Sequence, residues 1–530
     1  MASIPLRSRQ PAAAFFPDLL APDILHSLAL AAVDAARSAG AEYADVRIGD
    51  LRVLRLGIGE GGLVGIQDLI GDAPSGSIAY ELSYGIRARV GGAWASVFGN
   101  TCTLDAITAS AREAAATVRS LAPVIKQPWT MVPAPVAKGE WTTPIQIDPF
   151  AASPDEHVNL LGAFYNAACR TPDGDVWPNV TWTGETRVFA SSEGALTTQH
   201  FTRASPTLSL TAKTPLMVAR DIRAVTGRLP QLAPTSAGLE ILLGPALQET
   251  IKAAIVELTA LLRLPTTTAQ VGRYEAVFDG ASLGTLAAYT LAPAVELRRA
   301  LGYDADGDGT SFLSPPQDVL GQPLFSPQLT MTADRSMPHY NAAQWDDEGV
   351  SPQTFPLIKN GAVVDYFTTR ATAGALASWY QKTGQSVVSR GSAMAIRPRT
   401  APTGRASELT IASGAPGMTM DSLVRHVKNG LLVRSMEYIT TDPQLNGGAF
   451  FPDMLFEIKN GVVTRRVLKA AVQFGTKHLW KNMTTVGDAS TLDHGFSSRY
   501  ISPEVIATVS VRAPAAQFAQ LDVIQRQVNE

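Results

Sequence analysis

One short stretch of the chain could hold a catalytic serine. Gly280-Ala281-Ser282-Leu283-Gly284 matches G-x-S-x-G, the pattern of a nucleophile elbow, between a strand-like and a helix-like segment. The histidines downstream that could act as its base are His339, His426, His478 and His494. The alternating strand–helix pattern of an α/β-hydrolase does not follow, so an ordinary turn is the favoured interpretation and a serine hydrolase that uses Ser282 is an alternative.

Metal-ligating residues are scattered along the chain. The two histidines closest in sequence, His478 and His494, are sixteen residues apart, so no helix can present two histidines one turn apart, as the zinc motif H-E-x-x-H does. Two cysteines, Cys102 and Cys169, cannot supply a thiolate cluster or a disulfide framework. The sequence therefore predicts no metal in this chain. A site assembled from distant residues is the alternative, with the candidate ligands His339, Glu296 and His494.

The elements that must position these residues begin with two helices around several strands. Apolar residues with helical spacing predict helices near residues 23–39 and 104–115. Between them, period-two alternation predicts antiparallel strands, and Gly91-Gly92 predicts the turn of a hairpin. We expect a flexible tail at residues 1–22 and an N-terminal α+β domain at residues 23–122.

After the first ~120 residues, the sequence predicts a proline-rich linker and a long helix, and then mostly strands. An amphipathic pattern predicts that helix over residues 247–262. Beyond it, strand-like segments dominate, and Asn360-Gly361 and Asn460-Gly461 predict two hairpin turns. We expect a middle region at residues 123–269 and a large, mainly antiparallel β-rich domain at residues 270–530. The predicted fold class is therefore α+β.

The composition excludes several classes of protein. With 45% hydrophobic and 17% charged residues, this chain of 530 residues is globular rather than disordered. Its net charge of −3 argues against a nucleic-acid partner. No apolar run reaches the ~18 residues of a membrane span. The first 20 residues lack the apolar core of a secretory signal, so we expect a cytoplasmic protein without a membrane partner.

Ten segments, taken in order, resemble the TldD/PmbA family of peptidases. Their order and spacing, from about residue 40 to residue 510, carry the resemblance. The segments are AEYADVR at 41–47, GIRA at 85–88, GAWA at 92–95, TSFL at 310–313, WDDEGV at 345–350, LIKNG at 357–361, TGQS at 383–386, GLLV at 430–433, KNGVV at 459–463 and LWKNMTTVG at 479–487.

The resemblance implies a two-part fold whose subunits pair around a closed chamber. In the TldD branch, a helix with H-E-x-x-x-H and a C-terminal cysteine bind zinc. The zinc polarises a peptide carbonyl and activates water, and the motif's glutamate acts as the base. Partially unfolded or leader peptides are the implied substrates.

This chain departs from the TldD branch where the ligands should lie. We expect the motif helix between the strand that ends at Phe278 and residue Thr310, but the stretch at 292–297 contains no histidine, and no cysteine follows Gly487. The chain therefore looks like the PmbA (TldE) branch, the metal-free partner of a TldD-type zinc subunit. We expect a metal-free subunit of a TldD/TldE-type heterodimer. The alternatives are an active metallopeptidase with non-standard ligands and a homodimeric peptide-binding protein without catalysis.

This interpretation assigns no catalytic residue to the chain, with Ser282 or Glu296 as the alternatives. The expected contribution is to complete the proteolytic chamber and to bind extended peptides. Pairing of the peptide backbone with an exposed strand suits that task, because it tolerates different side chains. The candidate peptide-binding residues are Phe355, Leu357, Ile358, Phe450 and Leu455.

Overall fold

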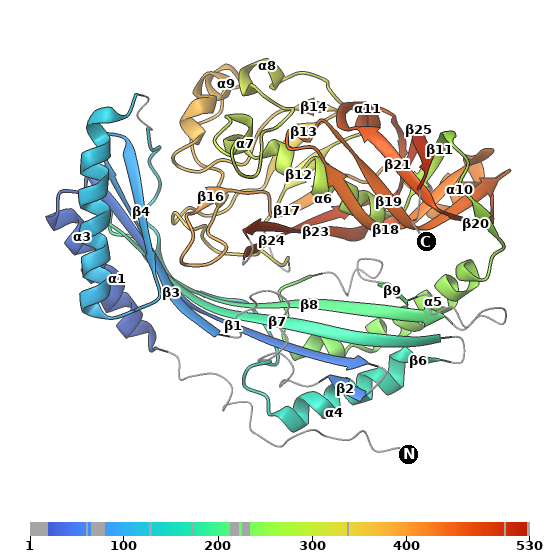
Figure 1. The fold of residues 1–530 in the computed structure, drawn as a ribbon, viewed down its shortest axis with the longest axis horizontal. Coiled ribbons are helices and arrows are strands. Elements are labelled where there is room, and N and C mark those ends of the chain that lie inside the picture. Colours follow the sequence, from blue (N-terminus) through green and yellow to red (C-terminus); the bar gives the residue numbers. More distant parts are fainter. Residues whose placement is uncertain are drawn as a thin grey trace.

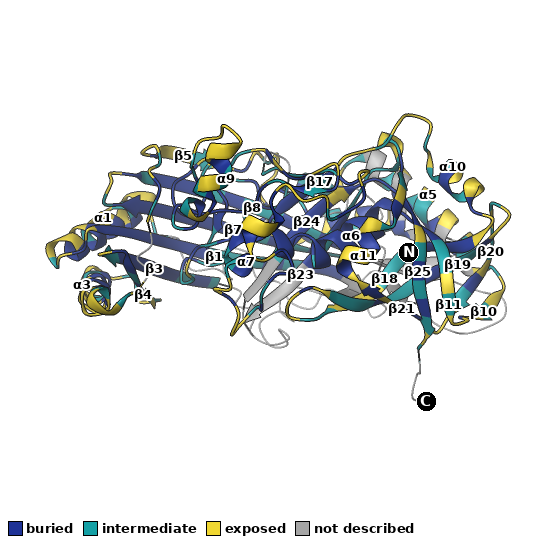
Figure 2. Ribbon diagram, turned by 90° about the horizontal axis from the view of Figure 1, so that it is seen from above, coloured by how far each residue is buried: buried dark blue, intermediate teal, exposed yellow. Residues whose placement is uncertain are grey.

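The computed structural model describes residues 20–59, 62–64, 80–126, 130–171, 174–212, 222–224, 234–335, 339–502 and 505–526. Residues 1–19 of the predicted tail lie outside this part of the chain. The described residues form a long curved sheet with helices on its outer face, and a larger strand-rich part that lies within the curve (Figure 1). Most strand residues of the curved sheet are buried, the strands of the larger part mix buried and intermediate residues, and exposed residues concentrate on helices and loops (Figure 2).

The curved sheet follows the strand order β4-β3-β1-β7-β8-β5. These strands are β1 (Tyr43–Gly59), β3 (Tyr80–Val90), β4 (Ala93–Gly99), β5 (Lys138–Thr142), β7 (Gly174–Ser191) and β8 (Leu196–Ala212), and the short strands β2 (Gly62–Val64), β6 (Arg170–Thr171) and β9 (Ile222–Ala224) pair at its margins. Neighbours are antiparallel except β5 and β8, which are parallel. Because β7 pairs with β1, the boundary expected at residue 122 does not separate two sheets.

The two predicted helices pack on the outer face of this sheet. They are α1 (Pro22–Ser38) and α3 (Leu104–Leu121), and alanines such as Ala32 and Ala111 are fully buried between helix and sheet. Gly91 and Gly92 have φ values of +57° and +83°, so the predicted hairpin turn between β3 and β4 is confirmed.

Two more helices cover the far end of the sheet. α4 (Pro154–Phe164) begins with a capping box, in which Ser153 and Glu156 accept each other's backbone N–H groups. α5 (Pro245–Leu262) confirms the helix predicted before Pro265. Buried residues of both helices share one core with Trp182 of β7. No helix in the described part of the chain has the length and apolar character needed to cross a membrane.

The first C-terminal sheet closes on itself. Its path is β10-β20-β19-β18-β11-β25-β21, β22 pairs with β25, and β19 also pairs with β21, so five of the strands form a ring. The strands are β10 (Thr266–Thr268), β11 (Gly272–Phe278), β18 (Asn429–Thr441), β19 (Gly447–Lys459), β20 (Val462–Leu468), β21 (Ala470–Gly475), β22 (Met483–Val486) and β25 (Ala516–Gln525). Phe278 packs against Phe450 and Phe518 in its core, with ring centroids 5.8 and 5.1 Å apart.

The second C-terminal sheet has the order β14-β13-β12-β17-β24-β23. Its strands are β12 (Met331–Ala333), β13 (Phe355–Lys359), β14 (Ala362–Val363), β17 (Glu408–Ile411), β23 (Asp493–Ser502) and β24 (Val505–Ala513), and β15 (Ala393–Met394) pairs with β16 (Thr403–Gly404) nearby. Positive φ at Asn360, Gly361, Asn460 and Gly461 confirms both predicted hairpin turns. The predicted α+β class is therefore confirmed.

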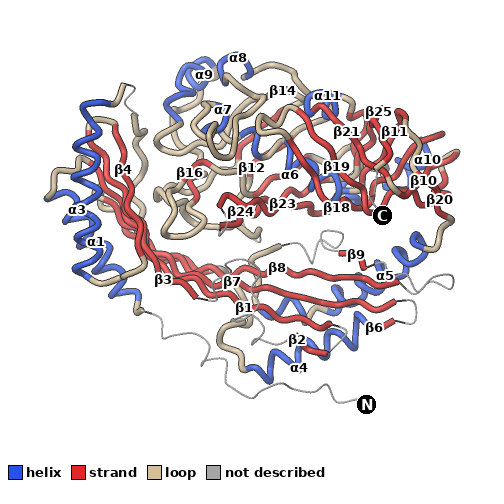
Figure 3. The backbone as a smooth tube through the Cα atoms, in the orientation of Figure 1, coloured by secondary structure: helices blue, strands red, loops and turns tan. Residues whose placement is uncertain are grey.

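Short helices complete the C-terminal part and lie mostly at its outer side (Figure 3). They are α7 (Leu297–Ala300), α8 (Pro316–Val319), α9 (Ala377–Lys382), α10 (Met420–His426) and α11 (Thr476–Lys481). The buried helix α6 (Gly280–Thr290) differs from them, because it packs against strands of both C-terminal sheets, β18 from one and β23 and β24 from the other.

Candidate functional site

α6 is the helix after β11, where the resemblance places a metal-binding helix. We expected that helix between Phe278 and Thr310, and α6 lies in this interval. Residues 292–297 hold only the 3-10 helix η6 (Pro293–Val295) and the beginning of α7. α6 instead begins at Gly280, because Asp279 accepts the N–H of Ser282 at 2.9 Å and caps the helix. No residue of α6 is a histidine, glutamate, aspartate or cysteine.

β23 closes one face of α6 by direct backbone contact. A Cβ atom on Gly284 would lie 2.7 Å from the amide nitrogen of Gly495, and a Cβ atom on Gly495 would lie 1.9 Å from that of Thr285. Such distances leave no space for a side chain at either glycine. A metal ion with its ligands therefore has no room between α6 and β23 at this contact.

Ser282 does not have the surroundings of a nucleophile. Its side chain is 3% exposed, and its hydroxyl has no hydrogen-bond partner among the described residues. Two of the candidate bases bond elsewhere: His426 to the carbonyl oxygen of Ser422, and His478 to the side chain of Asn482. A nucleophilic serine needs a base within hydrogen-bond reach. The G-x-S-x-G match is thus the buried first turn of α6.

His339 and His494 come together in the fold. Their ring centroids are 6.4 Å apart, and Nδ1 of His339 lies 3.8 Å from Oε2 of Glu408. Burial raises the pKa of Glu408 to about 8, although its carboxylate accepts the backbone and side-chain N–H groups of Asn341 at 2.9 and 3.0 Å. Burial, with His339 and Arg512 nearby, lowers the pKa of His494 to about 4. This cluster is therefore mainly uncharged at neutral pH.

Glu296 has other partners. Its Oε1 accepts the N–H of Ala406 at 3.0 Å, and its backbone pairs with Phe367. Within the ranges that the structure describes, no three histidine, cysteine, aspartate or glutamate side chains are arranged to hold a metal ion. The residues present therefore do not fit zinc, whose protein sites need three or four such ligands.

The five candidate peptide-binding residues lie in one hydrophobic core. Phe355, Leu357, Ile358, Phe450 and Leu455 are each at most 5% exposed. Their strands also have neighbours on both sides, β12 and β14 for β13, and β18 with β20 and β21 for β19. At Ile358 and Phe450, each strand therefore has partners on both sides and offers no free edge to a peptide.

Ion pairs join the curved sheet to the C-terminal part, and we call them the ionic seam. Arg87–Glu348 at 3.1 Å and Arg187–Asp347 at 2.7 Å are buried pairs, and the third is Arg370–Glu193 at 2.7 Å, whose glutamate is exposed. Residues 345–350, one of the segments that carry the family resemblance, supply two of the carboxylates. Burial and Glu348 raise the pKa of the neighbouring Asp346 to about 7, and its carboxylate accepts the N–H groups of Glu348 and Val350 at 2.9 Å.

The sequence analysis missed the ionic seam. A signal was present in β3, where Arg87 and Arg89 alternate with apolar residues that face the outer helices. An arginine in such a strand can face solvent or a buried partner, and sequence alternation alone does not distinguish the two.

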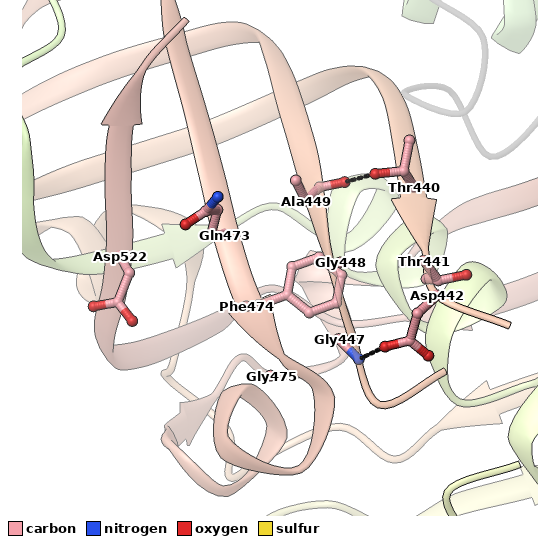
Figure 4. Close-up of a pocket in the computed structure, with 10 residues that line it drawn as sticks. All are labelled: Thr440, Thr441, Asp442, Gly447, Gly448, Ala449, Gln473, Phe474, Gly475 and Asp522. Carbon is pink, nitrogen blue, oxygen red and sulfur yellow. Dashed lines mark hydrogen bonds between the residues drawn. The ribbon is translucent and has the colours of Figure 1, made fainter. Parts of the chain in front are cut away.

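A groove of about 720 Å³ lies where β18, β19 and β21 meet (Figure 4). Asp442, at its rim, accepts the N–H of Gly447 at 2.9 Å and so closes the turn between β18 and β19. A Cβ atom on Gly448 would lie 1.9 Å from the carbonyl oxygen of Thr440. The glycines are therefore needed where the ring of strands closes, and the carboxylate of Asp442 serves the turn.

A second hollow, of about 500 Å³, lies between the β3–β4 hairpin and loops of the C-terminal part. We call it the Trp94 pocket. Arg87, Trp94 and Ser96 line it from the curved sheet, and Glu348, Thr372 and Thr403 are among its residues from the C-terminal part. Pockets of this size at the junction of two structural units are common ligand sites.

The C-terminal half of the chain matches a known family. Residues 271–525 match the model of the PmbA/TldA metallopeptidase C-terminal domain. A protein described as a metalloprotease, from Methanothermobacter thermautotrophicus, is 23% identical over 232 residues, which are 43% of this chain and 46% of that protein. The match thus spans about half the length of that relative.

Three solved structures share the fold over nearly the whole chain. TldE from Thermococcus kodakarensis has a TM-score of 0.63 at 15% identity, over 94% of this chain and 99% of that one. A proposed modulator of DNA gyrase from Thermotoga maritima has a TM-score of 0.65 at 13% identity, over 95% of this chain and 99% of that one. Another proposed modulator of DNA gyrase, from Bacteroides thetaiotaomicron, has a TM-score of 0.61 at 17% identity, over 94% of this chain and 98% of that one. Residues 271–525 thus form a C-terminal domain of the PmbA/TldD type, within a chain that shares the fold of these three structures.

Proposed function

We propose that this chain is a metal-free, TldE-like subunit of a TldD/TldE-type peptidase and acts in the cytoplasm. The observation that supports the proposal is α6, which lies between Phe278 and Thr310, where the family resemblance implies a metal-binding helix. It has no metal-ligating side chain, and β23 packs directly on its backbone. The zinc would reside in a TldD-type partner, where it would polarise the peptide carbonyl.

The role left to this chain is positioning. The ionic seam fixes the curved sheet against the C-terminal part through charge-assisted hydrogen bonds, and two of its three pairs are buried. A rigid wall of this kind can hold an extended peptide and exclude water from a neighbouring reaction centre. None of the groups of this chain needs to take part in bond cleavage.

The proposal is tested by co-expression with a family member from the same organism that carries H-E-x-x-x-H. We expect the two chains to co-elute in gel filtration, and we expect cleavage of an unfolded peptide only by the complex. Replacing the motif glutamate of the partner by glutamine should abolish cleavage. The double substitution Glu296→Gln and His494→Ala in this chain should leave it unchanged.

Two results would contradict the proposal. Chelator-sensitive cleavage by this chain alone would show that it binds a catalytic metal. Failure to co-elute with any such family member, together with a stable homodimer, would favour a peptide-binding protein without catalysis.

A further inference from the structure

β4 forms one edge of the curved sheet. Within the described residues it pairs only with β3, from Val90–Ala93 at the turn to Tyr84–Gly99 at the far end. In a hairpin with a two-residue turn, the pair that closes the turn is hydrogen-bonded and the next pair is not. The backbone N–H and C=O groups of Trp94, and of alternate residues after it, therefore point away from β3.

The side chains of β4 divide cleanly between its two faces. Ala93, Ala95 and Val97 pack in the core under the outer helices. Trp94 and Ser96 face the opposite way and line the Trp94 pocket. Residues that pair across neighbouring strands share a face of the sheet. A strand added beside β4 would therefore direct the side chains opposite Trp94 and Ser96 towards this pocket.

The pocket contains polar groups without partners. The indole N–H of Trp94 and the hydroxyl of Thr403 are buried, and neither has a hydrogen-bond partner among the described residues. Buried polar groups of native proteins are normally satisfied, so each unsatisfied group needs an explanation. The Trp94 ring itself is held firmly, with the Arg87 guanidinium 4.9 Å from its centroid and the Tyr43 ring 5.6 Å away.

We propose that the edge of β4 and the Trp94 pocket together bind an extended peptide. The peptide adds to the sheet as a further strand beside Trp94 and Ser96, and one large apolar or aromatic side chain enters the pocket. The indole N–H and the Thr403 hydroxyl then bond to oxygen atoms of the peptide. This inference rests on the proposed peptide-binding role and gives that role a location distinct from β13 and β19.

An extended peptide suits this place better than a compact ligand for two reasons. The outward N–H and C=O groups of an edge strand are complementary to another backbone in extended conformation. The pocket adjoins that edge on the same face, and its volume of about 500 Å³ is large enough for a bulky side chain.

The decisive variant is Ser96→Pro in the full-length chain. Proline removes the outward N–H and places its ring at the edge, while leaving the bonds between β3 and β4 intact. Its control is Ser96→Ala, which keeps the N–H. The probe is a fluorescein-labelled ten-residue threonine–serine peptide with one central phenylalanine, measured by fluorescence anisotropy. We expect Ser96→Pro to weaken binding at least about tenfold and Ser96→Ala to stay within about twofold.

Two further probes separate the edge from the pocket. The same peptide with alternate N-methylated amides should not bind, because it cannot form the ladder. The peptide with central alanine should bind more weakly than the phenylalanine peptide. Equal thermal midpoints of the two Ser96 variants, within about 3 °C, would show that both are folded.

Three results would overturn the inference. These are unchanged binding by Ser96→Pro, equal binding of the alanine and phenylalanine peptides, and loss of co-elution with the zinc-bearing partner on Ser96→Pro. The last would assign the edge to subunit pairing instead. If peptide binding behaves as expected but no partner yields cleavage, the peptidase proposal fails and the peptide site stands.

Discussion

Gly284 of α6 and Gly495 of β23 lie in backbone contact in the middle of the C-terminal part. A Cβ atom on Gly495 would lie 2.3 Å from the carbonyl carbon of Gly284, and one on Gly284 would lie 2.7 Å from the nitrogen of Gly495. Both residues need glycine because of this close approach. The contact also decides what α6 can do, because a helix face covered by a backbone cannot present ligands to a metal ion.

Gly495→Ala should destabilise the protein strongly. The new methyl group would lie 1.9 Å from the nitrogen of Thr285, and neither backbone can move without displacing α6 or β23. We expect a loss of about 3 kcal/mol of unfolding free energy, at the upper end for overpacking in a core. Urea unfolding, monitored by tryptophan fluorescence, measures this loss of unfolding free energy.

The matched control is Gly162→Ala. Gly162 lies in α4, and a Cβ atom there would meet nothing within 4 Å. Alanine is a better helix former than glycine, so this variant should be more stable by about 0.5–1 kcal/mol. A Gly495→Ala protein as stable as the Gly162→Ala protein would show that α6 and β23 are less tightly packed than the structure has them.

The isolated chain should contain well below one zinc ion per molecule after dialysis without chelator. The described residues offer no three metal-ligating side chains in a suitable arrangement, and α6 carries none in its sequence. Elemental analysis of the purified chain checks this. Replacing both His339 and His494 by alanine should leave the zinc content unchanged. About one zinc per chain in the wild type, lost in the double variant, would restore the metallopeptidase alternative.

Glu408 should make stability fall as the pH rises towards 8. Burial raises its folded-state pKa to about 8, above the unfolded value, so the folded state holds the proton more tightly. The stability from this group is fully present below about pH 4.5 and is lost as the pH rises through the folded pKa. His494, with its pKa lowered to about 4, acts in the opposite direction, since its contribution is lost as the pH falls below about 6.5.

The variant Glu408→Gln isolates the first effect, because His494 is present in both proteins. Glutamine keeps an oxygen that can accept the N–H groups of Asn341. We expect the stability of the wild type relative to this variant to fall by about 2–4 kcal/mol between pH 5 and pH 8. Urea unfolding at four pH values gives the difference. Parallel pH profiles would mean that Glu408 is already ionised in the folded protein at neutral pH.

Helices and turns could be predicted from local sequence signals, whereas the pairing of strands with one another could not. The helix near residues 104–115 and the turn at Gly91-Gly92 were predicted correctly, because apolar spacing and positive-φ residues act locally. β13 and β19 were expected to offer their edges to a peptide. Whether a strand lies at an edge depends on pairing with residues far away in the sequence, here β12 with β13 and β21 with β19.

For the candidate site too, the local sequence was informative and the contacts between distant residues were not predictable. The absence of H-E-x-x-x-H can be read directly from the sequence, but the packing of the helix that lies between Phe278 and Thr310 cannot. The reason is that Gly280 and Gly284 look like turn residues locally, whereas in the fold they allow α6 to touch β23 and β24. Arg187 and Asp347 are 160 residues apart, so no sequence spacing could pair them.

The ionic seam should be essential for docking of the curved sheet. Arg187 donates from Nη1 to both carboxylate oxygens of Asp347, at 2.7 and 2.8 Å, and to the carbonyl oxygen of Ala395 at 2.7 Å. Asp347→Ala would remove one of the two carboxylates that pair with this buried cation; the other is Glu185. We expect a loss of about 3 kcal/mol, because breaking a buried pair leaves an under-compensated charge.

Two comparisons separate the charge effect from lost packing. Glu249→Ala, which removes the exposed partner of Lys252, should cost less than about 0.5 kcal/mol. The double variant Arg187→Met and Asp347→Leu should recover part of the stability lost in Asp347→Ala, since it removes both charges of the pair, and Glu185, which loses Arg187, keeps Arg203 at 3.2 Å. Thermal unfolding of the wild type and these three variants compares their stabilities. If Asp347→Ala were no worse than Glu249→Ala, the seam would contribute little, and packing alone would hold the curved sheet against the C-terminal part.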